Sequence, residues 1–137
     1  LQVVSIKEDT SLPSNHPIPE DLAPAIQQLT DYFNGQRAVF DLLLNPQGTD
    51  FQKRVWKELL NVPFGRTVSY LDLSRRLGDE KAIRAVAAAN GKNPIWLIIP
   101  CHRIIGTDGS LTGYAGGLWR KKWLIEYEKG GLQGSLF

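Results

Sequence analysis

Between positions 49 and 63 the apolar residues recur about four residues apart, the spacing of one helix face: Phe51, Val55, Leu59 and Val62. Side chains at this spacing share one side of an α-helix, so an amphipathic helix packed against a core is predicted from Thr49 onward. A proline at position 63 and a glycine at position 65 predict its end.

Two shorter helical patterns follow, each closed by a glycine. The segment TVSYLDLSRRLG ends at Gly78, and DEKAIRAVAAANG begins at Asp79, a residue type suited to capping, and ends at Gly91. Two short helices joined at a glycine predict a helix-turn-helix. The second helix has five small side chains that let one side approach another surface closely: Ala82, Ala85, Ala87, Ala88 and Ala89. Tight packing in a core explains the same alanines.

The first 48 residues follow another pattern. LQVVSI is predicted to be a short strand, and residues 10–19 contain three prolines, which predict an extended linker that includes His16. A helix is predicted from Pro19, with acidic residues in its first turn, to a stop at Gly35, and the apolar stretch FDLLL follows. The chain is therefore predicted to divide into an N-terminal piece, residues 1–48, and a larger helical domain, residues 49–137.

Apolar segments bracket a short polar run near position 100. The residues WLII, 96–99, are predicted to form a strand, and after a proline come Cys101, His102 and Arg103. A final helix is predicted over residues 117–130, where Leu124 and Glu128 stand one turn apart on the same side.

Length and composition predict one ordinary domain with a small appendage, because the chain has 137 residues and 42% hydrophobic content. No stretch approaches the roughly 20 apolar residues of a membrane span, and the first ten residues lack the layout of a signal peptide. We therefore expect no membrane contact and a cytoplasmic location, or a nuclear one if the source is eukaryotic. The sequence contains no methionine, so we expect further residues before Leu1 in the natural product.

The chain contains one cysteine, which excludes an intramolecular disulfide and agrees with a reducing compartment. Its two histidines, His16 and His102, are too few to complete a Cys/His zinc tetrad with Cys101. We expect neither a metal nor a cofactor.

Charge is distributed unevenly along the chain. The first fifty residues contain two basic and seven acidic residues, net −5, whereas the remaining 87 contain 14 basic and seven acidic residues, net +7. Clustered Lys and Arg release counterions from a phosphate backbone, so the second part is a candidate for binding a polyanion. On charge alone, a solvated surface explains the asymmetry equally well.

The run Cys101, His102, Arg103 has the residue types of an activated nucleophile. A buried cysteine is usually an inert small hydrophobic residue. A neighbouring base or cation lowers the pKa of a thiol, and only the thiolate is a good nucleophile. A carboxylate that orients the imidazole would complete a proton relay.

The run IPCHRI, preceded by Asn93-Pro94 and followed by GSLTGYAGGL, resembles the active-site signature of the O6-alkylguanine DNA alkyltransferases. The likeness extends from Thr49 to Gly130, and residues 1–48 are similar to the end of a truncated N-terminal domain. The resemblance implies an α+β fold in which a helical C-terminal domain, with a winged helix-turn-helix and the active-site cysteine, follows a truncated N-terminal α/β piece. It also implies DNA repair by irreversible, stoichiometric alkyl transfer from a flipped O6-alkylguanine to Cys101.

The resemblance implies a catalytic role for five residues. Cys101 would accept the alkyl group, and His102 would take its proton through a water. Glu128 would hold the imidazole in the useful tautomer, and Asn93 would brace the turn beside the active-site strand. Tyr70 would help to rotate the nucleotide and would donate to the ring of the departing guanine.

The resemblance also implies how DNA is held. Arg84 would enter the duplex and fill the gap left by the flipped base, which must leave the stack before it can react. An Ala-rich face suits the narrow minor groove and implies indifference to sequence. The expected DNA contacts come from the helix-turn-helix and the active-site run: Tyr70, Ala82, Arg84, Ala85 and Arg103. The expected base pocket is formed by Ile104, Tyr114, Ala115 and Gly116.

The implied partner is double-stranded DNA that contains O6-alkylguanine, bound by a monomer. Ile83, Ala87 and Trp96 depart from the common pattern of the family and bear on groove fit and packing rather than on the chemistry. A non-catalytic relative that only binds damaged DNA would lack the acceptor cysteine, and a winged-helix transcription factor would need Arg, Asn and Gln on its second helix. A thiol protease would need a separate His and Asn, which this chain does not supply.

Overall fold

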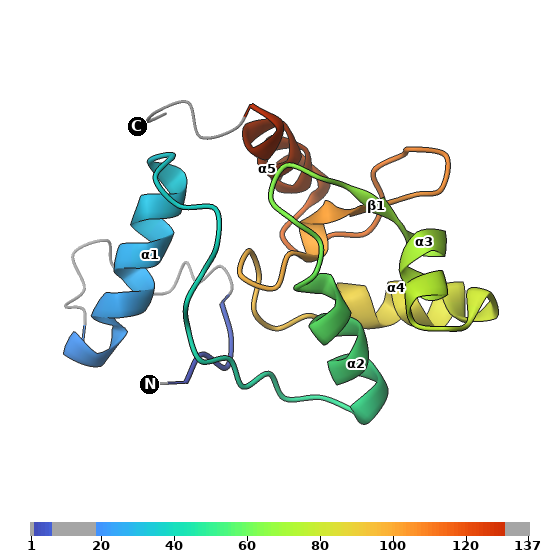
Figure 1. The fold of residues 1–137 in the computed structure, drawn as a ribbon, viewed down its shortest axis with the longest axis horizontal. Helices are drawn as coiled ribbons and strands as arrows, with labels where there is room; N and C mark the ends of the chain where they lie inside the picture. The colour runs from blue at the N-terminus through green and yellow to red at the C-terminus, as the bar shows by residue number, and fades with distance from the viewer. Residues whose placement is uncertain (1, 7–18, 131–137) are drawn as a thin grey trace.

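The computed structural model describes residues 2–6 and 19–130. In this part of the chain the helical elements are η1 (Glu20–Leu22), α1 (Ala23–Phe33), α2 (Asp50–Leu59), α3 (Tyr70–Arg76), η2 (Glu80–Ala82), α4 (Ile83–Gly91), η3 (Cys101–Arg103) and α5 (Leu118–Lys129). Two short strands, β1 (Val68–Ser69) and β2 (Ile104–Ile105), pair in parallel. Figure 1 shows α1 on one side of the molecule, α2, α3 and α4 grouped on the other, and α5 across one end. The predicted α+β class is confirmed.

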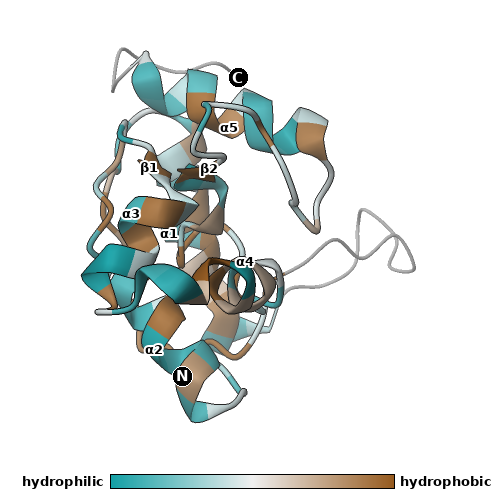
Figure 2. Ribbon diagram, turned by 90° about the vertical axis from the view of Figure 1, so that its right-hand side faces the viewer, coloured by the Kyte–Doolittle hydropathy of each residue, from teal (hydrophilic) through white to brown (hydrophobic). Residues whose placement is uncertain are grey.

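The helix predicted from Thr49 is present as α2. The Thr49 side chain accepts from the backbone N–H of Gln52, whose own side chain accepts from the N–H of Thr49, a reciprocal cap worth about 1 kcal/mol. The side chains of Val55 and Leu59 are fully buried. Trp56 adds a hydrogen bond from its indole N–H to the carbonyl oxygen of Ala89, at 2.8 Å, which ties α2 to α4. Figure 2 shows the matching bands of apolar and polar residues along α2.

The helix-turn-helix is formed by α3 and α4, which pack against each other and against α2. Gly78, at the turn, has a φ of +90°, a left-handed conformation that glycine adopts without strain. The Asp79 side chain accepts from the N–H of Lys81 and caps η2, which leads directly into α4. The predicted helix-turn-helix is therefore confirmed.

The start of the first of these helices was predicted too early. Residues Val68 and Ser69 form β1 and pair with Ile104 and Ile105 of β2, and the helix begins at Tyr70. The Ser69 side chain accepts from the N–H of Asp72 and caps α3. Tertiary pairing of an extended Thr-Val-Ser segment thus prevails over the local helical pattern.

The strand predicted at WLII is wrong. Residues 96–98 form a turn in which the N–H of Ile98 donates to the carbonyl of Trp96, and Leu97 between them has a φ of +76°. This is a γ-turn, which is rare because it strains the central residue. Local hydrogen bonds occupy this backbone, so it does not extend along the sheet.

In the described residues before position 49, the N-terminal piece contributes η1, α1 and two single-residue bridges rather than the predicted strand. Val3 pairs with Leu44, and Ile6 pairs with Ile95, both in parallel. The helix α1 is confirmed, with Gly35 in a left-handed conformation just beyond its end. Most of the predicted linker, with His16, lies outside the described residues. The division of the chain at residue 48 stays a prediction.

The helix α5 was predicted correctly, and its buried face includes polar residues. Leu124 and Glu128 are both buried, as their spacing predicts, and Lys121 one heptad before Glu128 is fully buried as well. Each helix in the described part of the chain is too short or too polar to span a lipid bilayer.

Candidate functional site

Cys101 is the first residue of η3 and is only 4% exposed. Pro100, which precedes it, has φ −82° and ψ 63°, and the N–H of Cys101 donates to the carbonyl of Ile99 at 2.8 Å. This inverse γ-turn turns the chain directly after the buried Ile99. The Asn90 side chain, from α4, donates to the carbonyl of Cys101 at 3.3 Å. The backbone around the sulfur is therefore held on both sides.

Asn93 braces the turn that leads to Cys101. Its Nδ2 donates to the carbonyl of Ile99 at 2.8 Å and to that of Ile95 at 3.4 Å, and its Oδ1 accepts from the N–H of Ile95 at 3.0 Å. One buried side chain thus joins both ends of the turn. This position matches the bracing role implied by the resemblance, and its effect on the reaction stays a prediction.

His102 and Glu128 form a buried pair. The Nε2 atom of His102 lies 2.8 Å from Oε2 of Glu128, and the two residues are 0% and 2% exposed. Burial raises the pKa of Glu128, but hydrogen bonds from His102 and Arg103 outweigh it and hold this pKa at about 2. The carboxylate is therefore ionised and accepts from Nε2–H, which leaves Nδ1 of His102 as the basic nitrogen. Within the described residues Nδ1 has no hydrogen-bond partner.

The thiol itself is less acidic than its sequence neighbours suggest. Burial raises the pKa of Cys101 to about 11, although the Asn93 side chain and the charge of Lys121 act in the opposite direction. Burial also lowers the pKa of His102, against the attraction of Glu128. The expectation that His102 and Arg103 would lower the thiol pKa is corrected: at rest the site holds a neutral thiol beside a neutral imidazole.

Arg103 is placed differently from the expectation. It is 6% exposed, and its Nε and Nη2 donate to the two carboxylate oxygens of Glu128 at 2.7 and 3.0 Å. Its Nη1 donates to the carbonyl of Val62 at 2.8 Å. With its donors bound inside the protein, Arg103 is not available for the DNA contact that was expected. Its observed partner is the carboxylate of the relay.

Ile104 also lies away from its expected position in a base pocket. It is fully buried and pairs with Val68 in the two-stranded sheet. Its side chain belongs to the core cluster that includes Leu73 and Val86. The pocket role expected for Ile104 is therefore not supported.

Lys121 is a site residue that sequence reasoning missed. It is fully buried, its Nζ donates to the carbonyl of Thr112 at 2.8 Å, and it lies 5.8 Å from the ring centroid of Tyr70. Burial lowers its pKa to about 8, and the nearby Cys101 partly opposes this. The available signal was its spacing, because Lys121 precedes Glu128 by seven residues and so shares the buried face of α5.

Tyr70 is held at the start of α3. It is 8% exposed, and its hydroxyl donates to the carbonyl of Thr112 at 3.2 Å, the same oxygen that Lys121 binds. Burial raises the pKa of Tyr70, so the hydroxyl keeps its proton and remains a donor. Tyr70, Lys121 and Cys101 thus surround one small region.

The helix α4 presents a mixed face. Arg84 and Ala85 are exposed, Ala82 is half-buried, and Ala89 is buried against α2. The five alanines therefore do not share one free side, because some of them pack in the core. The residues expected to contact DNA, Arg84 and Ala85, are accessible to a partner.

The loop 112–117 contains the three remaining residues expected to line the base pocket. Tyr114 is half-buried, Ala115 is exposed and Gly116 is buried. A Cβ at Gly116 would lie 2.8 Å from the Tyr114 ring and 3.3 Å from the Trp96 ring, so glycine permits this close approach. The Tyr114 and Trp96 ring centroids are 5.8 Å apart.

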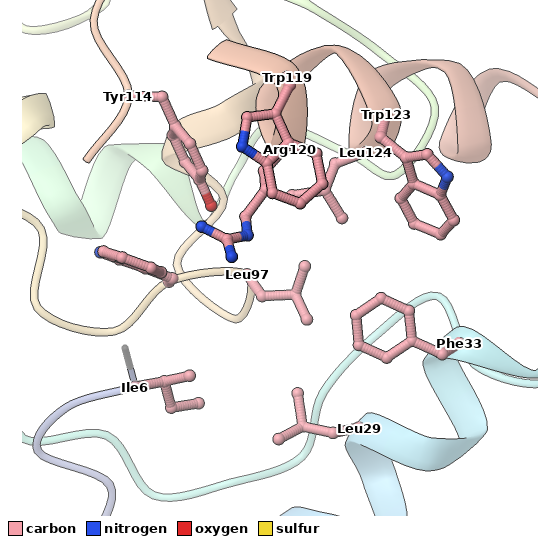
Figure 3. A pocket seen from close by; sticks show the side chains of 10 residues that line it. Ile6, Leu29, Phe33, Leu97, Tyr114, Trp119, Arg120, Trp123 and Leu124 are labelled. Carbon is pink, nitrogen blue, oxygen red and sulfur yellow. The ribbon is translucent and has the colours of Figure 1, made fainter. Parts of the chain in front are cut away.

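An apolar pocket of about 450 Å³ lies beside this loop, between α1, the turn 96–98 and α5. Figure 3 shows Leu29 and Phe33 facing Trp123 and Leu124, with Tyr114 at one end. Cys101 is not among its lining residues. The pocket adjoins the site rather than containing it.

A metal site is not evident in the described ranges 2–6 and 19–130, where no three His, Cys, Asp or Glu side chains gather. The titratable groups that interact electrostatically with Cys101 are instead a lysine and two tyrosines, and a histidine follows Cys101 in the chain. Donors of this kind suit proton transfer and charge stabilisation.

The chain is similar in sequence and in structure to known proteins. Residues 50–130 match the 6-O-methylguanine DNA methyltransferase, DNA binding domain. Two proteins named methylated-DNA–protein-cysteine methyltransferase are each 51% identical to this chain. The match to the protein of Mycobacterium tuberculosis covers 82% of this chain and 68% of that protein. The match to the protein of Methanosarcina barkeri covers 80% of this chain and 69% of that protein. A crystal structure of the Mycobacterium tuberculosis OGT in complex with DNA superposes with a TM-score of 0.86 at 45% identity, over 94% of this chain and 81% of that one.

Proposed function

This chain belongs to the 6-O-methylguanine DNA methyltransferase family, and we propose that it repairs DNA by transferring the alkyl group of an O6-alkylguanine to the sulfur of Cys101. The observation that carries the assignment to this atom is the placement of the chain's one cysteine. Cys101 is buried at the start of η3, directly before a histidine whose Nε2 is held by a carboxylate. A relative that only recognises damage would have no acceptor here.

The proton of the thiol leaves toward His102. With Nε2–H donated to Glu128, Nδ1 is the free base, and we propose that it takes the proton of Cys101 through a water. The sulfur then attacks the alkyl carbon in line, a carbon–sulfur bond forms, and the bond from that carbon to O6 of guanine breaks. The electron pair of the broken bond stays on the guanine.

Guanine is a poor leaving group unless its ring receives a hydrogen bond or a proton as charge develops. Tyr70 retains its proton and can donate to the departing base by exchanging its bond to the carbonyl of Thr112. Lys121 also donates to that carbonyl, so the oxygen keeps a partner when Tyr70 moves to the base. The buried cation also stabilises the thiolate that forms nearby.

DNA is the partner, and the exposed part of α4 is the surface that we assign to it. The alkylated base must leave the stack, which costs a few kcal/mol and needs a side chain to occupy the gap. Arg84 is exposed on α4 beside the small Ala85, an arrangement that supports insertion of Arg84 from the minor groove of a duplex. Small side chains read few base edges, so binding is expected to be indifferent to sequence and sensitive to salt.

The transfer is expected to happen once per molecule. A thioether at Cys101 has no easy leaving group, so displacement by a neighbouring side chain is not expected to regenerate the thiol. The steps described use only this chain's side chains and the DNA, and a monomer suffices for them. The named relatives come from bacteria and archaea, so we place the activity in the cytoplasm, with the chromosome.

A Cys101→Ser variant tests the proposal. Its hydroxyl is a far weaker nucleophile, so no label should pass from a duplex with radiolabelled O6-methylguanine to the protein, while binding to that duplex persists. Transfer of the label to the serine variant at the wild-type rate would contradict the assignment of Cys101.

A further inference from the structure

The N-terminal helix reaches the reactive centre through one side chain. Tyr32, in the last turn of α1, is fully buried, and its hydroxyl donates to Oε2 of Glu128 at 2.5 Å. The helix α1 lies outside residues 50–130, the part that matches the family's DNA-binding domain. A residue of the N-terminal piece therefore touches the carboxylate that holds His102.

We propose that Tyr32 is a positioning residue for alkyl transfer, whose hydroxyl fixes the Glu128 carboxylate in the orientation that presents Oε2 to His102. This inference rests on the roles assigned above to His102 and Glu128. Three donors converge on Oε2, namely the Tyr32 hydroxyl, His102 Nε2 at 2.8 Å and Arg103 Nη2 at 3.0 Å. Arg103 spans both carboxylate oxygens, and Tyr32 adds a separate donor on the oxygen that the imidazole uses.

The backbone and the ring of Tyr32 are held by neighbouring residues, among them one on α5. Tyr127, which precedes Glu128 on α5, donates its hydroxyl to the backbone carbonyl of Tyr32. The two aromatic rings meet edge-on, with centroids 5.5 Å apart, and Phe40 and Phe64 pack on the same tyrosine at 5.6 and 5.9 Å. The rings place Tyr32 by packing, and a phenylalanine could satisfy that packing alone. The hydroxyl is the part that acts on the relay.

This hydroxyl also sets how strongly Glu128 attracts a proton on His102. Burial, and then the charge of Glu128, raise the pKa of Tyr32, so the hydroxyl stays a donor throughout the pH range of the reaction. Each donor on a carboxylate reduces its basicity. Loss of this donor therefore makes Glu128 a stronger partner for the imidazolium and raises the pKa of His102. The charged groups that act on the His102–Glu128 pair, Arg103 and Lys121, remain in place. Burial raises the pKa values of Tyr114 and Tyr127, so both hydroxyls stay neutral in this pH range.

The test is Tyr32→Phe in the full chain, which removes the hydroxyl and keeps the ring. Single-turnover transfer from a duplex with O6-methylguanine is followed from about pH 5 to about pH 8, across the range in which a histidine base titrates. We expect the acid limb of the variant to move upward by about half a pH unit, so that its deficit against the wild type grows as the pH falls. A purely structural role would lower the rate by one factor at every pH.

Tyr127→Phe is the matched control, because it removes a buried hydroxyl bond between the same two helices and leaves the donors on Glu128 intact. We expect it to lower the melting temperature while keeping the wild-type pH profile. Coincident profiles for Tyr32→Phe and the wild type, or equal shifts in both variants, would overturn the positioning role. Failure of the wild type to accept any methyl group would instead overturn the proposed function.

Discussion

The imidazole Nε2 of His102 lies 2.8 Å from Oε2 of Glu128, and both side chains are buried. The pair fixes which imidazole nitrogen is free, because an ionised carboxylate accepts and so places the ring proton on Nε2. The reactive sulfur is one residue away in the chain, in the same short helix. Proton removal and nucleophilic attack are thereby assigned to neighbouring side chains.

Replacement of His102, the proposed general base, should slow methyl transfer without preventing DNA binding. We predict that His102→Ala lowers the single-turnover rate about 10²- to 10⁴-fold, the usual value of general-base help. Glu128→Gln should cost less, because its amide oxygen still accepts from Nε2–H. Rapid-quench measurement of methyl transfer, with binding to the same duplex as the control, distinguishes the two steps. An unchanged rate in His102→Ala would show that another group takes the proton.

The thiol should be protonated at neutral pH. Burial raises the pKa of Cys101 to about 11, so the neutral thiol dominates at pH 7 and the thiolate accumulates as the pH rises toward that value. Burial lowers the pKa of His102, so the acid limb of the transfer rate should lie below the ordinary titration range of a histidine. Ultraviolet titration of the thiolate checks the first statement. A full thiolate signal below pH 8 would contradict it.

Removal of the buried cation should make the thiol still weaker as an acid. Lys121 favours the thiolate through its charge, so Lys121→Met should raise the pKa of Cys101 and slow transfer. Because the pKa of Lys121 is lowered to about 8, this advantage of the wild type should fade as the pH rises above that value. Lys122→Met is the control, because Lys122 is adjacent to Lys121, is exposed and carries the same charge. Equal effects in both variants would exclude a specific role for Lys121.

The exposed arginine of α4 should matter only when a duplex must be opened. We predict that Arg84→Ala reduces repair of O6-methylguanine in double-stranded DNA far more than reaction with the free alkylated base, for which no gap has to be filled. Lys57→Ala, an exposed charge on α2, is the control for a general loss of phosphate attraction. Equal losses of Arg84→Ala on duplex and free base would remove the wedge role.

Sequence patterns predicted the elements whose stability is local. The capping pair of Thr49 and Gln52, the left-handed turn at Gly78 and the apolar face through Val55 each act over a few residues, and α2 and the helix-turn-helix are confirmed. The turn around Leu97 was missed, because its φ of +76° is imposed by side-chain bonds from Asn93 and by tertiary packing. Apolar letters alone do not distinguish such a turn from a strand.

In the site, too, local features were predicted from the sequence and features that depend on tertiary structure were not. The neighbours Cys101 and His102 were evident as a motif, and the resemblance pointed to Glu128. The electrostatic consequence was not evident, because the thiol pKa depends on burial as well as on adjacent charges. Two further partners, Tyr32 and Lys121, come from α1 and α5, and only the fold brings them to the relay.

The most direct test of the central claim is the stoichiometry and position of alkylation. The protein is incubated with an excess of duplex that contains O6-methylguanine, the methyl groups gained per protein are counted by intact mass, and the tryptic peptide 93–103 is sequenced by fragmentation. We predict one methyl group per molecule, located on Cys101, with no further transfer after longer incubation or fresh DNA. Continued turnover, or a methyl group on any residue other than Cys101, would contradict the account.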